Sequence, residues 1–361
     1  MRVIVGAGGT GGHLYPALAL VEYIKEKEPD SEFLFVGTKD RLESTVVPKQ
    51  GYNYVGLNVQ GLVGNPIKKG IAMAIFVKSI FTAKKIVKKF NPDIVIGFGG
   101  YPSASVVEAA SRLGYKTMIH EQNSIIGLTN KILIKHVDKI VCCYDLAYEH
   151  FPKEKTYKLG NPRESVIASI KPKDIFHKYD LDKNKPLVTI VMGSLGSKSV
   201  NEKMLESLRS FEKKDYQVLY VTGKNNFEEM STKLGKLKQN VKLVPYIDDM
   251  PSVLKNTSLV VSRAGASTIA EITAIGIPAI LIPSPYVAAN HQEYNARELV
   301  ERDAAKMILE TDLNGKDFVK EVDYILSNQI VQESMKKNAK ALGKPNALND
   351  IYKLIKKMLG A

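Results

Sequence analysis

Short apolar runs alternate with longer amphipathic stretches along the 361-residue chain, and this alternation limits the possible fold more than any other feature of the sequence. Ten of the runs are rich in β-branched residues: RVIV, EFLFVG, DIVIGFGG, KTMIHE, KIVCC, LVTIVMG, QVLYVTG, KLVPY, LVVSR and AILIP. Nearly continuous apolar strands separated by helices are typical of parallel sheets covered on both faces. The chain is therefore predicted to be an α/β protein with doubly wound sheets.

The pattern occurs twice, which predicts two domains. A strand followed by a glycine turn is expected at residues 2–12 and again at residues 187–197, and the length of the chain suits two domains. The segment 151–164 carries prolines and charges without strong periodicity, and it is interpreted as a linker. Such folds bind ligands at the carboxyl ends of their strands, so we expect two Rossmann-like domains facing a cleft. The tail NDIYKLIKKMLGA is predicted to be an amphipathic helix.

The composition narrows the class of protein. The formal charge of +13 indicates a polyanionic partner, which could be nucleic acid, an anionic membrane surface or a phosphorylated substrate. No run of about 18 apolar residues occurs, so no membrane-spanning helix is predicted. The first residues also lack the pattern of a signal peptide. The adjacent Cys142 and Cys143 would point to opposite faces of a strand and are expected to be reduced, as in a cytoplasmic protein.

Three glycine-rich turns lie between predicted strands and helices: GAGGTGGH (6–13), GFGGYPSAS (97–105) and MGSLGSKS (192–199). Backbone N–H groups and a helix N-terminus make such a turn a site for phosphate, although a tight turn without a ligand is the alternative. The first two turns are expected to hold one pyrophosphate together, and Ser194 of the third would add a hydroxyl. The first turn loosely matches a dinucleotide fingerprint. No acidic residue ends the second strand, EFLFVGTKD, so a nicotinamide-dependent dehydrogenase is not favoured.

Two polar groups at strand ends of the first half are candidates for catalysis. His13 stands where the first turn enters its helix, and the helix dipole disfavours an imidazolium there, so a neutral imidazole able to accept a proton is expected. A capping or packing role is the alternative for His13. The sequence HEQN (120–123) includes Glu121 and follows a predicted strand, where a solvated loop is the alternative. The pair HE is not followed by the second histidine of a zinc helix, so no metal site is predicted.

Polar side chains of the second half suit a nucleotide sugar. Glu271 is expected one or two turns into a helix that follows a glycine turn, where a carboxylate can accept two hydrogen bonds from a ribose diol. Asn290, His291, Gln292 and Asn295 form an amide-rich set, and amides bind sugar hydroxyls without the cost of burying a charge. Each residue alone is equally consistent with a polar surface, but together they favour a nucleotide-sugar pocket.

The stretch KKGIAMAIFVKSIFTAKKIVKKF (68–90) is predicted to be a helix with a basic face. At 100° per residue, one stripe about 140° wide contains five lysines: Lys78, Lys84, Lys85, Lys88 and Lys89. The opposite face carries Phe76, Ile80, Val87 and Phe90. Val77 and Phe81 fall within the lysine stripe, which a purely solvated face would not need. We therefore expect docking on anionic lipid headgroups, with an ordinary basic helix as the alternative.

Eight motifs, in order and spanning residues 8–296, closely resemble the MurG family: GGTGGHLYPALAL, GFGGYPSAS, HEQNSIIGLTN, GNPRE, GSLGS, PYIDDM, SRAGASTIAE and HQEYNA. This resemblance implies the GT-B fold and the inverting transfer of N-acetylglucosamine from UDP-N-acetylglucosamine to the 4-hydroxyl of lipid I, which forms lipid II for peptidoglycan. It further implies an acceptor-binding and membrane-docking domain at 1–162, a donor-binding domain at 163–340, and a helix at 341–361 that packs back on the first domain.

The resemblance also implies roles for single residues. His13 would be the catalytic base, with Glu121 as the second candidate. The acceptor would be bound by Gly9, Thr10, Gly99, Gly100, Tyr101 and His120. The donor would be bound by Thr10, Gly11, Gly12, Asn123, Arg163, Ser194, Ile247, Ala266, Glu271, Gln292 and Asn295. Membrane contacts would come from Lys78, Phe81 and Lys85.

The expected partners are UDP-N-acetylglucosamine, undecaprenyl-linked lipid I and the anionic cytoplasmic membrane surface, on which the protein would be peripheral. Nucleic acid is not expected, because aromatic-basic RNA motifs are lacking. No tightly bound cofactor or protein-bound metal is expected, since no DxD motif lies near the turns; Mg²⁺ bridging phosphates stays open. A related glycolipid-forming transferase with another acceptor is the main alternative, disfavoured by the HEQN and GGYPS motifs. The chain departs from the family pattern at Met192, Leu195 and Ser197, and its GNPRE sequence places Arg163 one residue early.

Overall fold

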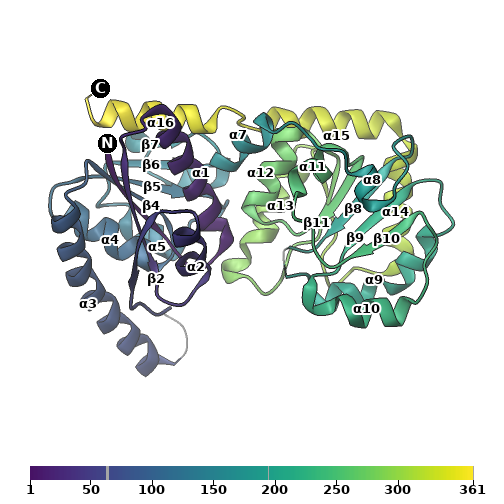
Figure 1. Cartoon of the computed structure of the whole chain (residues 1–361), viewed down its shortest axis with the longest axis horizontal. Helices are drawn as coiled ribbons and strands as arrows, with labels where there is room; N and C mark the ends of the chain where they lie inside the picture. The colour runs from purple at the N-terminus through teal and green to yellow at the C-terminus, as the bar shows by residue number, and fades with distance from the viewer. Residues whose placement is uncertain (62–64, 194, 361) are drawn as a thin grey trace. The chain divides into compact units, whose positions relative to one another are not determined.

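The computed structural model describes residues 1–61, 65–193 and 195–360, and the chain forms two compact units (Figure 1). Unit 1 comprises Met1–Ser165 together with Asn346–Ala361, and unit 2 comprises Val166–Pro345. The change from unit 1 to unit 2 falls after Ser165, three residues beyond the expected boundary.

Unit 1 is built on a seven-stranded sheet in the order β3-β2-β1-β4-β5-β6-β7. Its strands are β1 (Arg2–Ala7), β2 (Glu32–Thr38), β3 (Asn53–Leu57), β4 (Ile94–Gly99), β5 (Lys116–Glu121), β6 (Lys139–Cys142) and β7 (Thr156–Lys158). Neighbouring strands pair in parallel. The strand order reverses direction between β1 and β4, which is where ligands bind in sheets of this kind.

Helices cover the sheet of unit 1 and explain why its central strands are apolar throughout. They are α1 (Gly11–Lys27), α2 (Leu42–Lys49), α3 (Pro66–Phe90), α4 (Tyr101–Ser111), α5 (Leu128–Leu133), α6 (Asp145–His150), α16 (Ala347–Met358) and, at its end, the start of α7 (Pro162–Ser169). Every residue of β4 is buried, as a strand with helices on both sides requires. The core includes Ile4 and Val95 from the strands and Val107 and Ala110 from α4.

The C-terminal helix α16 belongs to unit 1 and packs against α1 (Figure 1). As the tail sequence predicts, α16 is amphipathic, with a buried face formed by Ala347, Leu348, Ile351, Leu354 and Ile355. At the polar edge of the contact, the hydroxyl of Tyr352 donates to Glu28 at 2.8 Å and Lys356 forms an ion pair with Glu28 at 2.9 Å. The last helix of the chain is therefore part of the same domain as the first strand.

Unit 2 repeats the design with a six-stranded sheet in the order β10-β9-β8-β11-β12-β13. Its strands are β8 (Leu187–Val191), β9 (Gln217–Val221), β10 (Val241–Val244), β11 (Leu259–Ser262), β12 (Ala279–Leu281) and β13 (Lys306–Met307). Its helices are the end of α7, α8 (Phe176–Tyr179), α9 (Lys198–Phe211), α10 (Phe227–Leu234), α11 (Met250–Lys255), α12 (Ala266–Ile275), α13 (His291–Val300), α14 (Gly315–Ser327) and α15 (Gln329–Leu342). The strands pair in parallel here too.

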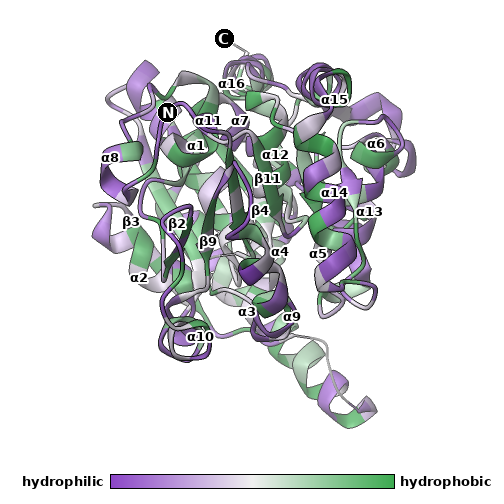
Figure 2. Ribbon diagram, turned by 90° about the vertical axis from the view of Figure 1, so that its right-hand side faces the viewer, coloured by the Kyte–Doolittle hydropathy of each residue, from purple (hydrophilic) through white to green (hydrophobic). Residues whose placement is uncertain are grey.

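The hydropathy of the ribbons follows these layers (Figure 2). The strands are mostly hydrophobic, whereas helices such as α14 carry hydrophobic and hydrophilic turns side by side. On α14 the buried residues are Phe318, Val319, Val322 and Ile325, which lie three or four positions apart and form one face. None of the helices in the described parts of the chain is long and apolar enough to cross a membrane.

All ten runs predicted to be strands form strands, but the interpretation of 151–164 as a linker is wrong in part. Residues Thr156–Lys158 form β7, which pairs with β6 at the edge of the first sheet. Three residues are too few to show an alternating pattern, and only the contact with β6 defines the strand. The two other strands that the sequence reading misses, β3 and β13, are also at or near sheet edges.

Candidate active site

The two glycine turns of unit 1 are in contact with each other. The N–H of Gly8, after β1, donates to the carbonyl of Gly99, at the end of β4, at 3.2 Å. Gly100 has φ +83, and a Cβ at this position would lie 2.5 Å from the carbonyl oxygen of Gly8. A side chain cannot fit there, so the close approach of the two turns requires glycine. The turns that the sequence predicts to act together therefore meet at the point where the strand order reverses.

His13 lies at this junction, with each ring nitrogen in a defined environment. Its Nδ1 is 2.9 Å from the carbonyl oxygen of Gly8. A carbonyl can only accept a hydrogen bond, so in this contact Nδ1 carries the hydrogen and Nε2 of the neutral ring keeps its lone pair. Nε2 lies over Gly99, where a Cβ would be 2.7 Å away. The geometry suits a group that accepts a proton through Nε2.

The N-termini of α1 and α4 open at the same edge of the sheet. Thr10 is the N-cap of α1 but its side chain makes no capping hydrogen bond, and neither helix has an acidic residue in its first turn. The first N–H groups of a helix have no acceptor within the helix and carry partial positive charge. Gly11, Gly12 and Tyr101 begin these two helices, so their backbones suit the binding of a phosphate or diphosphate.

Gly9 was predicted to bind the acceptor together with other residues of the two glycine turns, but its backbone N–H is hydrogen-bonded within unit 1. Its N–H donates to both carboxylate oxygens of Glu43, at 3.2 Å each. Glu43 comes from the first turn of α2 and is almost completely buried. The Gly9 N–H therefore has a partner within the protein, although it was expected to bind the acceptor. The sequence reading did not single out Glu43, which lies five residues beyond the end of β2.

His120 is fully buried and both of its ring nitrogens have partners within unit 1. Nε2 lies 3.0 Å from the carbonyl of Gly160, and Nδ1 lies 3.1 Å from the side-chain nitrogen of Gln122. The ring also stacks on Phe98, with centroids 5.2 Å apart. Burial lowers the pKa of His120 from 6.5 to about 4, a shift that the Gly160 carbonyl partly opposes. In this arrangement His120 stabilises the carboxyl end of β5, and neither of its ring nitrogens is available to bind an acceptor substrate.

Glu121, the second candidate base, has its carboxylate occupied by donors from the loop that follows. One oxygen accepts from the backbone N–H of Asn123 at 3.1 Å and the other from the N–H of Gly127 at 2.9 Å. The side chain of Asn130 donates to the second oxygen at 2.8 Å. A carboxylate with these partners orders the loop around Asn123, which leaves His13 as the better placed base of the two.

In unit 2, the turn after β8 is held by a buried ion pair that the sequence reading missed. Arg263, which follows β11, pairs with Glu310 at 2.5 Å and donates to the hydroxyl of Ser197 at 2.8 Å. Glu310 also accepts from the hydroxyl of Ser199 at 2.6 Å. Ser197 caps α9 by accepting from the N–H of Val200. The serine that departs from the family pattern thus has three partners, since its hydroxyl also lies 3.1 Å from that of Ser199. Ser194 of the same turn lies outside the described residues.

Three further predicted donor residues follow strands of the second sheet, and one lies at the end of unit 1. Ala266 begins α12 and Glu271 lies in its second turn, half-buried. Ile247 follows β10, and its side chain packs into the core. Arg163, at the end of unit 1, lies half-buried in the first turn of α7.

The two amides of α13 that were expected to bind sugar make hydrogen bonds to neighbouring turns. Gln292 accepts from the N–H of Ser284 at 2.9 Å, and Asn295 donates to the carbonyl of Ala264 at 3.2 Å. Asn295 is completely buried, so it shapes the turn after β11 and has no exposed surface for a sugar. Gln292 is half-buried and lies nearer the surface.

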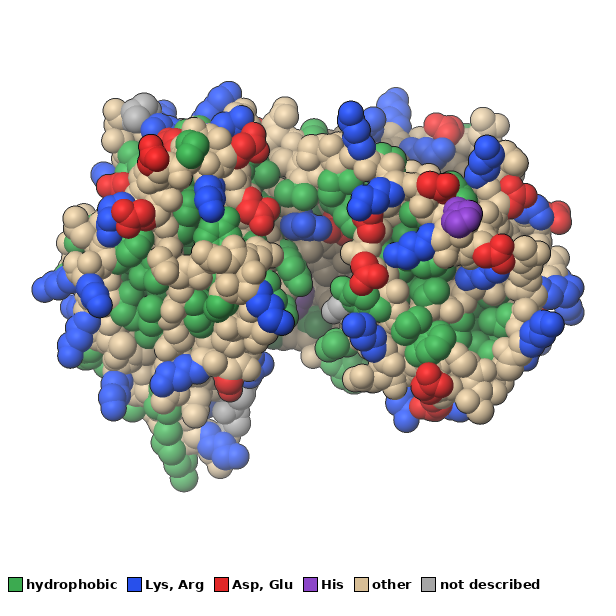
Figure 3. Space-filling view, in the orientation of Figure 1, with side chains coloured by type: hydrophobic (Ala, Val, Ile, Leu, Met, Phe, Trp, Pro, Cys, Tyr) green, Lys and Arg blue, Asp and Glu red, His purple; other side chains and the backbone are tan. Residues whose placement is uncertain are grey.

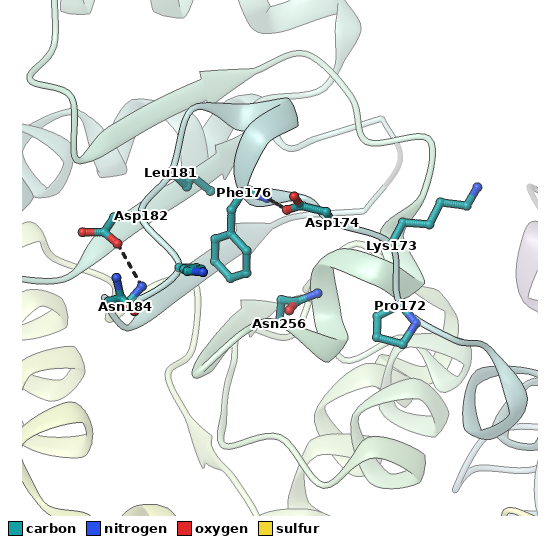
Figure 4. A pocket seen from close by; sticks show the side chains of 9 residues that line it. Pro172, Lys173, Asp174, Phe176, Leu181, Asp182, Asn184 and Asn256 are labelled. Carbon is teal, nitrogen blue, oxygen red and sulfur yellow. Dashed lines mark hydrogen bonds between the residues drawn. The ribbon is translucent and has the colours of Figure 1, made fainter.

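A surface pocket of unit 2, with a volume of about 540 Å³, lies apart from these residues (Figure 4). Its lining includes Phe176, Asn184 and Asn256, and the latter two each come three residues before a strand. The pocket is therefore at the amino ends of β8 and β11, away from the turns that follow the strands. Within the described parts of the chain, no three His, Cys, Asp or Glu residues come close enough together to hold a metal ion.

Comparisons with known proteins agree over the whole chain. Residues 3–142 match the glycosyltransferase family 28 N-terminal domain, and residues 187–351 match its C-terminal domain. A protein of Leuconostoc mesenteroides is 45% identical over 362 residues and one of Pediococcus pentosaceus is 42% identical over 359 residues, with at least 99% of each chain covered. Both are named UDP-N-acetylglucosamine--N-acetylmuramyl-(pentapeptide) pyrophosphoryl-undecaprenol N-acetylglucosamine transferase.

Solved structures show the same fold. The crystal structure of Acinetobacter baumannii MurG has a TM-score of 0.81 at 26% identity and covers 99% of both chains. A Staphylococcus aureus MnaA–UDP structure, at 17% identity and a TM-score of 0.71, is similar in fold alone. Two parallel α/β units with these matches have the GT-B fold. The chain therefore belongs to glycosyltransferase family 28 and, within it, to the MurG family.

Proposed function

We propose that this chain transfers N-acetylglucosamine from UDP-N-acetylglucosamine to the 4-hydroxyl of the muramic acid of undecaprenyl-linked lipid I, and so forms lipid II for peptidoglycan. The observation that carries the proposal is the meeting of two glycine turns at His13, in a chain 42–45% identical over its full length to proteins named for this transfer. The sequence identity supports the assignment of the two substrates, and the position of His13 supports its role in proton transfer.

Unit 1 would hold the acceptor. The N-termini of α1 and α4 would bind its diphosphate through backbone N–H groups, with Thr10, Gly99, Gly100 and Tyr101 around it. The acceptor hydroxyl would attack the anomeric carbon of the donor sugar as the bond from that carbon to the UDP oxygen breaks, which inverts the carbon. The hydroxyl proton would pass to Nε2 of His13, the nitrogen left without a hydrogen by the contact of Nδ1 with Gly8.

Unit 2 would hold the donor. Negative charge grows on UDP as it leaves, and backbone N–H groups at the N-termini of α9 and α12 would stabilise that charge. Glu271 would accept hydrogen bonds from the ribose, the backbone of Ile247 would bind the uracil, and Gln292 would contact the sugar. From unit 1, Gly11, Gly12, Asn123 and Arg163 would add contacts to the donor, as the family resemblance implies. The reaction would need no protein-bound metal.

Helix α3 would place the enzyme at the cytoplasmic face of the membrane. Unit 1 contains 25 Lys and Arg against 16 Asp and Glu, whereas unit 2 contains 26 against 22. On α3 the expected inward residues Phe76 and Val87 are buried, while Phe81 is 62% exposed. Figure 3 shows hydrophobic side chains at the free end of α3, with basic side chains beside them and farther along the helix. Anionic headgroups attract such lysines by about 1 kcal/mol each, and the apolar side chains would enter the lipid.

Transfer of labelled N-acetylglucosamine from its UDP donor to a lipid I analogue tests the proposal directly. His13→Ala is expected to lower kcat by at least about 100-fold, the usual size of a lost general base, while the affinity for UDP-N-acetylglucosamine, measured by calorimetry, stays unchanged. Absence of transfer by the wild-type protein would refute the function, and near-normal turnover by the His13 variant would refute only the assignment of the base.

A further inference from the structure

The peptide group between Gly8 and Gly9 has a polar partner on each side. Its carbonyl oxygen accepts from Nδ1 of His13 at 2.9 Å, and its N–H donates to the Glu43 carboxylate at 3.2 Å. The carbonyl and N–H of a trans peptide point in opposite directions. Glu43 and His13 are therefore connected through one rigid group, although they do not touch.

Glu43 is held firmly at this place. Its carboxylate accepts two hydrogen bonds from Thr38, one from the backbone N–H at 3.0 Å and one from the hydroxyl at 2.8 Å. These two donors add to the N–H of Gly9. Only 1% of the residue is exposed. Space for it depends on Gly37, where a Cβ would lie 2.6 Å from Cγ of Glu43. Its position in the first turn of α2 also favours a negative charge.

We infer that Glu43 is a positioning residue for His13 and acts through the Gly8–Gly9 peptide. The inference rests on the proposed function, in which His13 is the base. By accepting from Gly9, the carboxylate fixes the orientation of the peptide and so aims the Gly8 carbonyl at Nδ1. Hydrogen bonds in a chain also polarise one another, which strengthens the contact with Nδ1. The imidazole is thus held with the lone pair of Nε2 free, and the positive charge that it gains during the reaction is partly balanced.

This arrangement resembles the carboxylate–histidine pair of hydrolytic triads in its physical logic. There the carboxylate contacts the imidazole directly, and here a peptide group lies between the two. A role in holding the base predicts a loss in kcat. It predicts no change in donor affinity, because Gly9 and Thr38, to which Glu43 is hydrogen-bonded, are not among the proposed donor residues.

The variant Glu43→Gln keeps the shape of the side chain but removes its charge and one of its two acceptor oxygens. We expect kcat for transfer to fall by about 10- to 100-fold, the size found when a group that orients a functional histidine is lost, with KM for UDP-N-acetylglucosamine unchanged. A control variant separates this effect from loss of packing. Glu108→Gln changes a second buried carboxylate, which pairs with Arg112 and His136. It should retain kcat within about twofold, as expected for a site that is not part of the Glu43 hydrogen-bond network.

Two further measurements decide whether Glu43 acts through His13. In the His13→Ala background, Glu43→Gln should cause no further loss of kcat. In ¹⁵N NMR of the ring, the wild type should show one tautomer with a slowly exchanging Nδ1–H, and Glu43→Gln should show a mixture or fast exchange. An additive loss in the double variant, or an unchanged ring signal, would overturn the inference. If the wild type transfers no sugar, the proposed function fails, but the NMR comparison still tests the link between the two residues.

Discussion

Two histidines of unit 1 show how the surroundings of a residue decide its chemistry. His120 is buried between the Gly160 carbonyl and Gln122, and burial lowers its pKa to about 4. His13 is half-buried, and its Nδ1 is hydrogen-bonded to the Gly8 carbonyl of the first glycine turn. Sequence position alone places both at the polar ends of the sheet, so the difference follows from how many neighbours each ring has.

The buried state of His120 predicts a pH-dependent stability. Above pH 6.5 the ring is neutral in the folded and unfolded chain, and its contribution to stability is complete. Between pH 6.5 and 4 the unfolded chain binds a proton that the folded chain does not, so the free energy of unfolding should fall by about 3 kcal/mol over this range. Urea unfolding at pH 7 and pH 5 measures the effect. In the variant His120→Gln, the free energy of unfolding should change less between these two pH values. An equal change in the variant would contradict the assignment.

At the scale of elements, α3 combines exposed apolar and basic side chains along one helix. The helix begins at Pro66 after Asn65, whose side chain accepts from the N–H of Lys68 at 2.9 Å. Its buried residues are Ala72, Phe76, Ser79, Ala83 and Val87. The exposed hydrophobic residues lie in the first two thirds, at Ile67, Ile71, Met73, Val77 and Phe81. Four of the five lysines of the basic stripe lie beyond Phe81, and Lys68 and Lys69 are exposed in the first turn, so lysines stand at both ends of the apolar stretch.

Liposome flotation tests the function of this helix. Lys78→Glu combined with Lys85→Glu should lower binding to anionic vesicles by at least about tenfold, because each lysine near the surface contributes about 1 kcal/mol. Phe81→Ser should weaken binding further by removing an inserted side chain. The matched control is Lys337→Glu, an exposed lysine on α15 of unit 2, which should bind as the wild type does. Equal recovery of the wild type on neutral and anionic vesicles would argue against docking.

At the scale of the whole molecule, the two ends of the chain build one domain. Helix α16 packs on α1, and Glu28, which directly follows α1, accepts from Tyr352 and pairs with Lys356 and the N-terminal amine. These contacts lower the pKa of Glu28 below its usual range. The charged contacts are partly exposed and contribute little, so most of the stabilisation comes from the buried face of α16.

Substitutions within α16 test this division. Ile351 is completely buried, and Ile351→Ala should lower the free energy of unfolding of unit 1 by about 2–4 kcal/mol through the lost burial and the cavity. Lys353→Ala changes an exposed residue of the same helix and should change stability by no more than about 0.5 kcal/mol. Guanidinium unfolding of the full chain provides both values. Similar values for the two variants would mean that α16 adds little to unit 1.

Ten strands and the positions of the glycine turns could be predicted from local patterns in the sequence. A strand buried on both faces must be apolar along its length, and a turn that approaches another backbone must lack side chains. Three edge strands were missed, because β7 and β13 have only three and two residues and β3 lacks the continuous apolar run of a strand buried on both faces. The amphipathic tail was visible, since its pattern is local as well.

The polar residues of the site were only partly predictable, because their roles depend on contacts between distant segments. The sequence determined that polar groups stand at the ends of strands and that His13 enters a helix there. Only the tertiary structure decided that His120, Glu121 and Asn295 use their hydrogen-bonding capacity within the protein, since buried polar groups need partners. It also brought Glu43 to Gly9, 34 residues away, and Arg263 to Ser197, 66 residues away. Apolar periodicity is local and can be read directly, whereas the pairing of buried polar groups is known only once the chain has folded.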